Sequence, residues 1–446
     1  MNTNHSAPFK TLEPLEPLMD KCVHCGFCLP TCPSYVLLGQ EMDSPRGRIY
    51  LMRAGVENRV GMQPSVVHHF DTCLGCMACE TACPSGVKYA PLIEQTRAAI
   101  ESQHPRPASE QWFRRLLFSV LPYPARLRLL AIPLVIAGPF RRSPAIMRLL
   151  PERLRTMLTL APSVSIAETR RETAELTAAQ GSVRGRVGLV TGCVQRAFFG
   201  DVNQATARVL AAEGYEVRAP RSQGCCGALA LHAGEDETAR QFARSLIATF
   251  EQADVETIAV NAAGCGSAMK EYGHLLRNDP AWAERAAAFS RKVRDVTEIL
   301  ATCDPPRASR RSLTLKVAYH DACHLAHAQG VRAEPRKVLS SIPGVSVVPF
   351  EESEICCGSA GIFNLVQPEM ASQLGKRKAD NIARSSPDVV VTSNPGCILQ
   401  IRSAAAQAGH SYRVMHIVEL LDRAINSNDA GNSQRSHEGH EGHENP

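Results

Sequence analysis

The sequence predicts a multidomain chain in which an α-helical N-terminal domain is followed by two repeated α/β modules. Three observations carry this prediction. Eight of the 17 cysteines lie near the N-terminus in two copies of one short pattern, and eight more recur at matched spacing in two later segments. Each later segment begins with a strand-like run and continues with helix-like stretches, which is typical of a duplicated α/β unit. A chain of 446 residues, 44% of them hydrophobic, is long enough for two or three domains.

The two N-terminal runs both read C-x2-C-x2-C-x3-C-P, the bacterial ferredoxin pattern that holds a [4Fe–4S] cluster. When two such runs are present, the fourth cysteine of each ligates the other cluster. A zinc site fits less well, because zinc usually takes two separated pairs of ligands, and a disulfide framework fits no better. The predicted ligands are Cys22, Cys25, Cys28 and Cys83 for cluster 1, and Cys73, Cys76, Cys79 and Cys32 for cluster 2.

The N-terminal part divides into a flexible arm, residues 1–20, and a two-cluster ferredoxin-type domain, residues 21–105. The 40 residues between Cys32 and Cys73 are too many for a compact β-rich ferredoxin loop, so we expect helices there. Ser44 before Pro45 suits a helix N-cap with proline in the first turn. The domain is therefore predicted to be α-helical.

Residues 106–184 form a basic and apolar connecting segment. Its arginine-rich part, Trp112 to Leu160, carries nine arginines and one acid, Glu152. Its longest apolar run, Leu129 to Phe140, is 12 residues long and is too short to cross a bilayer. Such a segment can lie on an anionic membrane surface or in a groove of a partner; the alternative is a connector packed over the neighbouring domains. The arginines are Arg114, Arg115, Arg126, Arg128, Arg141, Arg142, Arg148, Arg153 and Arg155.

Composition sets the expected compartment. Residues 1–20 lack the basic-then-apolar order of a signal peptide, so we expect a cytoplasmic protein, with peripheral attachment to the cytoplasmic face of the inner membrane as an extension. Seventeen cysteines in a reducing compartment indicate metal binding or catalysis, not structural disulfides. The net charge of +5 is mild, and no basic recognition helix indicates nucleic acid.

The two repeated modules span residues 185–305 and 312–425. In the first, the spacings between successive cysteine motifs are 32 and 39 residues; in the second they are 33 and 40. Each motif follows a strand-like run, so the cysteines should lie at the carboxyl ends of strands, where open sheets place their ligand crevices. Helices are expected between them, at Gln204–Glu213, Glu235–Ala253 and Pro368–Ala383. The matched sets are Cys193, Cys225, Cys226 and Cys265, and Cys323, Cys356, Cys357 and Cys397.

Four thiolates from three loops are enough to hold one further iron–sulfur cluster in each module. A redox dithiol and plain packing are the alternatives. Adjacent cysteines before a glycine suit a turn, where glycine lets a bulky ligand approach the chain. Only Cys303 is left over, and it is expected to be an ordinary buried thiol.

Histidines outside these motifs have weaker expectations. A polar set around Cys323 could orient a cluster or relay protons. The first repeat has Val190, Thr191 and Val194 at the matching positions. His68 and His69 are expected to be packing or surface residues. The tail, residues 426–446, is expected to be disordered, with weak metal binding as the alternative role of its histidines. The polar set is His320, Asp321 and His324, and the tail histidines are His437, His440 and His443.

Here the motifs support a resemblance that covers residues 21–425. The repeats resemble the cysteine-rich CCG domains of heterodisulfide reductases and of succinate:quinone, glycerol-3-phosphate and lactate oxidising systems. Two CCG modules after a two-cluster ferredoxin domain resemble the iron–sulfur subunits of glycolate oxidase. One departure counts against a noncubane cluster: heterodisulfide reductases end each repeat with C-x-x-C, whereas Cys265 is followed by Gly-Ser-Ala and Cys397 by Ile-Leu-Gln.

The resemblance implies an electron-transfer subunit, inactive alone, in a complex that oxidises glycolate to glyoxylate. Removing two electrons and a proton needs a hydride acceptor such as flavin, and no G-x-G-x-x-G follows a strand here. FAD is therefore expected on a partner flavoprotein, with electrons leaving for a membrane quinone or another acceptor. The alternatives are a subunit of a glycerol-3-phosphate or lactate dehydrogenase, a heterodisulfide-reductase-like catalytic subunit, or a redox sensor. No catalytic residue is assigned.

Overall fold

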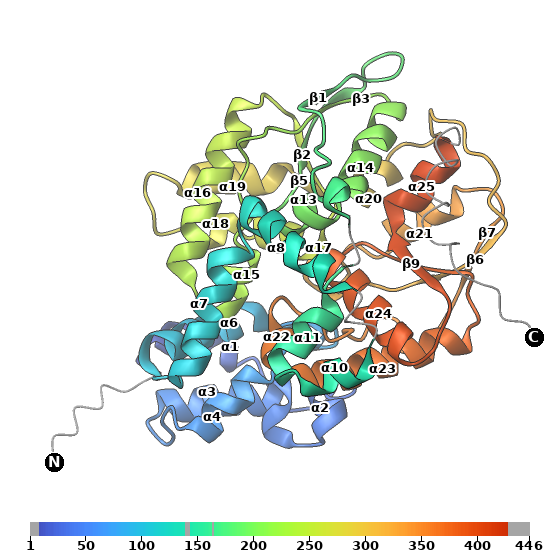
Figure 1. Cartoon of the computed structure of the whole chain (residues 1–446). Coiled ribbons are helices and arrows are strands. Elements are labelled where there is room, and N and C mark those ends of the chain that lie inside the picture. Colours follow the sequence, from blue (N-terminus) through green and yellow to red (C-terminus); the bar gives the residue numbers. More distant parts are fainter. Residues whose placement is uncertain (1–8, 139–142, 163–164, 427–446) are drawn as a thin grey trace, which may run out of the picture.

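The computed structural model describes residues 9–138, 143–162 and 165–426. A helical N-terminal domain lies at the bottom of Figure 1, and two α/β modules lie above it and to its right. A chain of helices joins the two parts. Residues 1–8 of the predicted flexible arm and nearly all of the predicted tail, with its three histidines, lie outside the described residues. The prediction of a flexible arm is wrong for residues 9–20, which form two short helices and bury Phe9, Leu12 and Met19 in the core of the N-terminal domain.

The N-terminal domain is helical, as predicted, and residues 9–103 contain no strand. Ser44 caps its central helix, because the Ser44 hydroxyl accepts a hydrogen bond from the Gly47 amide at 3.0 Å. Phe9, Phe70 and Leu92 are fully buried in its core. Its elements are η1 (Lys10–Leu15), α1 (Glu16–Met19), α2 (Pro33–Leu38), η2 (Glu41–Asp43), α3 (Pro45–Val56), α4 (Pro64–Asp71), α5 (Ala78–Thr81) and α6 (Tyr89–Gln103).

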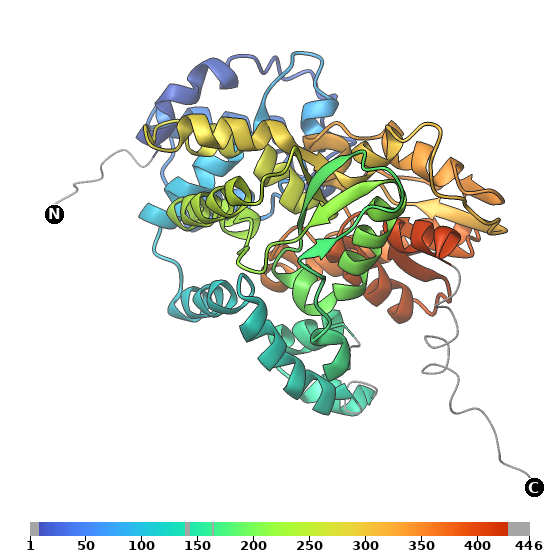
Figure 2. The same cartoon turned by 90° about the horizontal axis from the view of Figure 1, so that it is seen from above.

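The connecting segment forms short helices that stand out from the sheets in Figure 2. Phe113 and Leu117 anchor its first helix against Ala233 and Ile362 of the two modules. No helix in the described residues is by itself long and apolar enough to cross a membrane; α7 and α8 meet this test only as a pair, bent by 108°. The helices are α7 (Ala108–Val120), α8 (Pro124–Ile136), α10 (Pro144–Leu149), α11 (Glu152–Leu160) and α12 (Ile166–Thr169).

Module 1 is built on a sheet with strand order β1-β3-β2-β4-β5, parallel except for β1. Strand β1 comes from the end of the predicted connecting segment, so the sheet begins earlier in the chain than its first long strand. The strands are β1 (Leu176–Thr177), β2 (Gly185–Val190), β3 (Tyr215–Arg218), β4 (Thr257–Val260) and β5 (Val293–Asp295). The helices are α13 (Val194–Phe198), α14 (Gly200–Ala212), α15 (Ala228–Ala233), α16 (Asp236–Gln252), α17 (Ala263–Lys270), α18 (Tyr272–Leu275), α19 (Ala283–Lys292) and α20 (Val296–Ala301).

Module 2 repeats this plan with strand order β7-β6-β8-β9, all parallel. The predicted duplication is therefore confirmed at the level of topology, since β3, β2, β4 and β5 correspond to β7, β6, β8 and β9. The strands are β6 (Leu315–Tyr319), β7 (Val345–Val348), β8 (Val389–Thr392) and β9 (Arg413–His416). The helices are η3 (His324–Ala328), α21 (Ala333–Ser340), α22 (Phe363–Val366), α23 (Pro368–Arg384), α24 (Pro395–Gln407) and α25 (Ile417–Ile425).

The two modules share one hydrophobic core. The last helix of each module packs on the first long helix of the other: α25 lies against α14, and α20 lies against α21. Buried side chains from both sheets, such as Leu189 and Val390, belong to the same core. Arg208 and Asp422 form an ion pair across the contact, and the His416 imidazole bonds to the Asn261 carbonyl at 2.8 Å. This reciprocal exchange makes the modules one pseudo-symmetric unit, as the repeat spacing predicts.

A glycine ends each CCG turn in the left-handed backbone region. Gly227 has φ +77° and Gly358 has φ +90°. A Cβ atom at Gly358 would lie 2.7 Å from the carbonyl oxygen of Ala371, so only glycine fits between the turn and α23. Gly409, after α24, also has positive φ (+73°), but its Cβ would meet nothing within 4 Å.

We therefore expect Gly358→Ala to lower the free energy of unfolding by about 3 kcal/mol, and Gly409→Ala by about 1 kcal/mol. Both variants place alanine in the left-handed backbone region, which is unfavourable. Only the alanine at position 358 also clashes with the Ala371 carbonyl. Denaturant unfolding of the full chain, followed by circular dichroism, checks this. Equal losses for the two variants would contradict the close approach.

Candidate cysteine-lined redox site

The first cysteine run lies in the loop between α1 and α2, and its last member, Cys32, is the N-cap of α2. Burial raises the pKa of Cys22, and the charges of Cys83 and Cys25 add to the rise. Burial likewise raises the pKa of Cys28 to about 11, with smaller contributions from Cys22 and Cys32. The fold thus brings Cys83, from the second run, beside the first three cysteines.

The second run follows α4 and continues into α5. Burial raises the pKa of Cys79 well above its usual value, and the charges of the other thiols of its run and of Cys32 raise it further. Cys32 therefore lies beside the second run, although it also neighbours Cys28. Unpaired, these buried thiolates would repel one another, whereas bound iron would neutralise them. The residues present fit iron–sulfur clusters by donor type and by this charge requirement.

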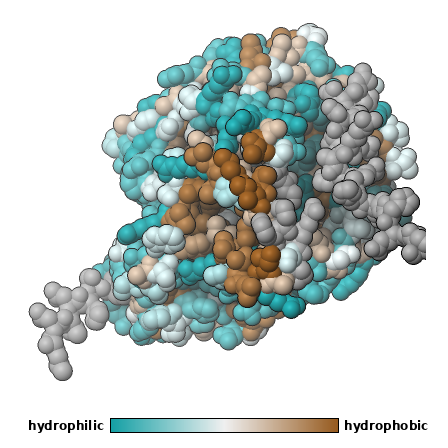
Figure 3. Space-filling model, viewed as in Figure 1, coloured by the Kyte–Doolittle hydropathy of each residue, from teal (hydrophilic) through white to brown (hydrophobic). Residues whose placement is uncertain are grey.

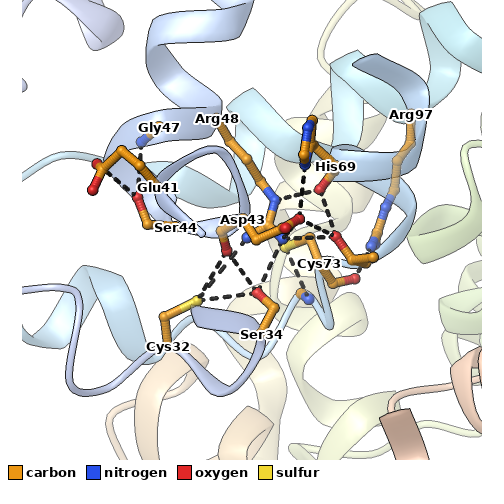
Figure 4. Close-up of polar contacts among 12 residues, drawn as sticks. Cys32, Ser34, Glu41, Asp43, Ser44, Gly47, Arg48, His69, Cys73 and Arg97 are labelled. Carbon is orange, nitrogen blue, oxygen red and sulfur yellow. Dashed lines mark hydrogen bonds and ion pairs between the residues drawn. The ribbon is translucent and has the colours of Figure 1, made fainter. Parts of the chain in front are cut away.

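A buried arginine links the two runs (Figure 4). Arg48 on α3 is fully buried and lies 4.0 Å from the sulfur of Cys32. Its guanidinium donates to the His69 carbonyl at 2.5 Å and lies 3.6 Å from the Asp43 carboxylate. Asp43 also contacts the His69 ring at 3.0 Å. Arg48 therefore places a fixed positive charge at the point where the runs cross.

A second arginine ties the N-terminal domain to module 1. Arg97 on α6 donates to the Cys73 carbonyl at 2.5 Å and to the His232 carbonyl at 2.8 Å. Although burial by itself raises the pKa of Cys73, the charges of Arg48 and Arg97 bring it below the usual value. Two neighbouring arginines thus favour the thiolate form of Cys73.

The cysteines of each module converge at the carboxyl ends of parallel strands, as predicted. In module 1, the sulfur atoms of Cys193 and Cys225 lie 3.6 Å apart. Hydrogen bonds with Cys225 and Cys265 lower the pKa of Cys226 well below its usual value. The four predicted cysteines of module 1 therefore form one group, in which Cys265 is partly exposed and the other three are buried.

Module 2 has the same arrangement. The sulfur atoms of Cys323 and Cys356 lie 3.9 Å apart. Hydrogen bonds with Cys356 and Cys397 lower the pKa of Cys357 well below its usual value. All 17 cysteines lie in the described part of the chain and none forms a disulfide.

The cysteine groups are neighbours in space. Cys76 and Cys323 lie in the same buried cluster, together with Leu74 and Phe363. Burial raises the pKa of Cys76, and the charge of Cys323 is the next largest cause. The second run therefore adjoins module 2 directly.

Two histidines bridge the modules. His324, next to Cys323 in sequence, has Nδ1 3.5 Å from the Cys323 sulfur and Nε2 3.1 Å from Nε2 of His232. His232 Nδ1 in turn lies 3.5 Å from the Glu94 carboxylate. Burial raises the pKa of Glu94 to about 7. These three side chains line a cavity of about 910 Å³ between the N-terminal domain and the modules, which also receives His274.

The remaining sequence expectations have varied outcomes. Asp321 does not face the cysteines; it forms a two-pronged ion pair with Arg336 at 2.8 and 2.9 Å. His69 is more than a packing residue, because it holds Asp43 beside Arg48. Cys303 is an ordinary buried thiol, bonded to the Ile299 carbonyl at 3.6 Å.

Comparison with known proteins agrees with this architecture. Residues 18–87 match the family model of a 4Fe-4S dicluster domain, and residues 187–270 and 317–402 match that of a cysteine-rich domain. A probable glycolate oxidase iron–sulfur subunit of Bacillus subtilis is 38% identical over 413 residues, covering 90% of this chain and 92% of its own. The glycolate oxidase iron–sulfur subunit of Escherichia coli is 35% identical over 412 residues, covering 92% and 94%.

The chain belongs to the family of glycolate oxidase iron–sulfur subunits. It is therefore an iron–sulfur electron-transfer subunit of a dehydrogenase complex. A solved structure of a hypothetical protein from Helicobacter pylori aligns with a TM-score of 0.55 at 8% identity, covering 94% of this chain and 76% of its own. That likeness extends to the fold alone.

Several residues of the site lie outside the cysteine motifs and were not predicted from the sequence. Arg48, Glu94 and Arg97 come from helices whose cysteine-free sequence carries no signal of metal binding. His232 follows the first CCG turn by five residues, and Lys378 lies in the middle of α23. Aligning the two repeats would have drawn attention to Lys378, because the matching position in module 1 is apolar.

We expect Arg48→Gln to lower the free energy of unfolding by about 3–5 kcal/mol, because it leaves the Asp43 carboxylate buried without its cation. Arg46→Gln is the matched control, since the Arg46–Glu41 pair is partly exposed and should contribute less than about 1 kcal/mol. Anaerobic denaturant unfolding measures both. An Arg48→Gln loss as small as that of the control would contradict a buried charge balance.

Proposed function

We propose that this chain accepts electrons from a flavoprotein partner that oxidises glycolate to glyoxylate, and passes them to a membrane quinone or another acceptor. One observation carries the proposal: three cysteine groups adjoin one another, from the first run through the second run to Cys323 of module 2. The names of the two full-length relatives support glycolate as the substrate of the complex.

Two [4Fe–4S] clusters are proposed for the N-terminal domain, with the crossed ligand sets described above. When bound, such clusters supply one-electron transfer at potentials set by charge and hydrogen bonding. The protein's own contribution is to fix the ligand loops, exclude water and balance charge through Arg48 and Arg97. In each module, four thiols fit a further iron–sulfur centre better than a bare dithiol, because soft thiolates select such clusters.

FAD is proposed to reside on the partner. Its chemistry, hydride acceptance from a 2-hydroxy acid, needs a site that orients flavin and substrate together. No dinucleotide-binding motif occurs in the sequence, and the eight cysteines of the two modules already occupy the strand ends where such a motif would lie.

The helices of the connecting segment are proposed to rest on the cytoplasmic face of the inner membrane. Figure 3 shows a hydrophobic patch on the face of the molecule that carries the connecting helices in Figure 1. The exposed apolar residues of these helices include Leu149, which is 86% exposed, and Trp112 and Leu129, each 66% exposed. Exposed arginines, such as Arg115 and Arg126, lie among them. An apolar face bordered by positive charge suits the interface of an anionic bilayer.

The cluster proposal predicts that anaerobically purified protein contains about eight iron and eight sulfide ions or more. Because the ligands cross, Cys32→Ser should alter the same paramagnetic signal as Cys76→Ser, and Cys83→Ser the same signal as Cys22→Ser. Cys303→Ser is the control and should retain both signals. About four iron ions with zinc in addition, or an uncrossed pattern of losses, would refute the assignment.

If FAD and glycolate oxidation belong to the partner, the isolated chain should not oxidise glycolate with an artificial acceptor. Activity should appear when the flavoprotein partner is added, and a panel of glycolate, lactate and glycerol-3-phosphate then identifies the preferred substrate. Turnover by the chain alone would overturn the proposal. Preference for another member of the panel would keep the electron-transfer role and change the complex.

Membrane attachment predicts that Arg115, Arg126, Arg148 and Arg155, all changed to Gln, weaken binding to vesicles containing anionic lipid. Each arginine near such a surface contributes on the order of 1 kcal/mol, so the loss should exceed a hundredfold. Flotation of vesicles measures it. The control removes the same charge elsewhere, by changing Arg277, Arg291, Arg294 and Arg311 to Gln. If both variants bind as the unchanged protein does, the segment is only a connector.

A further inference from the structure

Module 2 differs from module 1 beside its cysteines. A ring nitrogen of His320 and the sulfur atoms of Cys357 and Cys397 all lie within 4.8 Å of one another, and all three residues are buried. His320 directly follows β6, three positions before Cys323. In module 1 the matching position, three before Cys193, is Val190. The imidazole is therefore an addition to one copy of an otherwise shared cysteine arrangement.

The hydrogen bonding of His320 leaves one nitrogen available. Nδ1 lies 3.2 Å from the carbonyl oxygen of Ser353. A carbonyl can only accept, so Nδ1 carries the proton and Nε2 carries a lone pair. His320 is completely buried. Among the described residues no geometric hydrogen bond reaches Nε2, and the ring interacts with the side chain of Cys357. A buried acceptor left unpaired is costly, which calls for an explanation.

Metal binding explains this arrangement. A histidine that ligates a metal normally donates its other N–H to a carbonyl or carboxylate, which fixes the ring orientation and the tautomer. The Ser353 carbonyl fills that role here. One ring nitrogen of His320 lies within 4.8 Å of the sulfur atoms of Cys357 and Cys397, and imidazole with thiolates is a donor set that suits iron and zinc.

A buried cation accompanies the same cysteines. Lys378 on α23 is 2% exposed, and its ammonium donates to the carbonyls of Glu352 and Ser353. The two CCG glycines face Ala239 and Ala371, which are 132 positions apart, and at that offset Lys378 matches Leu246 of module 1. Burial lowers the pKa of Lys378 to about 8, and the charge of Cys357 is the largest opposing influence. The charge of Glu352 compensates part of this buried cation, and negative charge on the neighbouring thiolates would compensate it further.

We propose that His320 is a direct ligand of the metal centre in module 2, together with Cys357 and Cys397, making it a mixed imidazole–thiolate site for iron or zinc. Module 1 would keep an all-thiolate set. This inference rests on the proposed function in one respect, the presence of metal in module 2. If the metal is redox-active iron, replacing a thiolate by neutral imidazole makes the centre less negative and raises its reduction potential.

The test compares full-length wild-type protein with His320→Ala, His320→Cys and the matched module 1 control Val190→Ala. Iron and zinc are counted after anaerobic purification. Pulsed electron paramagnetic resonance then looks for nitrogen coupling to an iron centre distinct from the two ferredoxin clusters, with and without ¹⁵N-labelled histidine. For a zinc-containing preparation, X-ray absorption at the zinc edge looks for the nitrogen ligand instead.

We expect wild type and Val190→Ala to show a metal-bound histidine nitrogen, and His320→Cys to lose it while retaining the metal. In the iron case, His320→Cys should also shift the midpoint potential to a more negative value. His320→Ala should lose most of the metal of module 2 and leave the ferredoxin signals intact.

Two results would overturn the inference, and they separate it from the function. Metal in module 2 without any histidine nitrogen removes His320 as a ligand and leaves the electron-transfer role untouched. No metal beyond the ferredoxin iron also overturns it, and then rejects the proposed cluster in module 2. Because His320→Cys keeps a ligand at the position, poor folding of His320→Ala does not prevent a decision.

Discussion

The exchange of helices between the two modules is the contact on which the rest of the structure depends. Helix α25 packs on α14, α20 packs on α21, and side chains from both sheets fill one core. Burying a core of this size is the main favourable contribution to folding, so neither module can shift without exposing apolar surface of the other. The distance between the two CCG groups is fixed as a result, and the N-terminal domain can rest across both.

Charge is the second constraint. Sixteen cysteines are gathered into small groups, and the pKa values of many are raised by burial and by their neighbours. Positively charged side chains lie beside these thiols and offset their negative charge. They are Arg48 where the two runs cross, Arg97 at Cys73, and Lys378 beside Cys357. Buried cations are costly unless compensated, so their positions mark where negative charge is expected when metal is bound.

Much of this organisation could be predicted because it depends on local spacing. The two C-x2-C-x2-C-x3-C-P runs predict the dicluster domain, and Ser44 before Pro45 predicts the start of α3. The cysteine spacing of the repeats predicts two α/β units, and the helices predicted near Gln204, Glu235 and Pro368 are confirmed by α14, α16 and α23. The roles of the polar residues around Cys323 were harder to predict, because they depend on where each side chain points. His320 and His324 face cysteines, whereas Asp321 pairs with Arg336.

The sequence by itself determined which cysteines are the candidate ligands and that a dicluster domain precedes two cysteine-rich repeats, because ligand spacing and repetition are properties of neighbours along the chain. Tertiary structure alone decided what joins the groups. His232 meets His324 although 92 residues separate them, and Cys76 adjoins Cys323 although they belong to different domains. Such contacts arise when two sheets and a helical domain bury their apolar faces together, and no local pattern encodes that. The open nitrogen of His320 is likewise visible only once the Ser353 carbonyl has been placed against its ring.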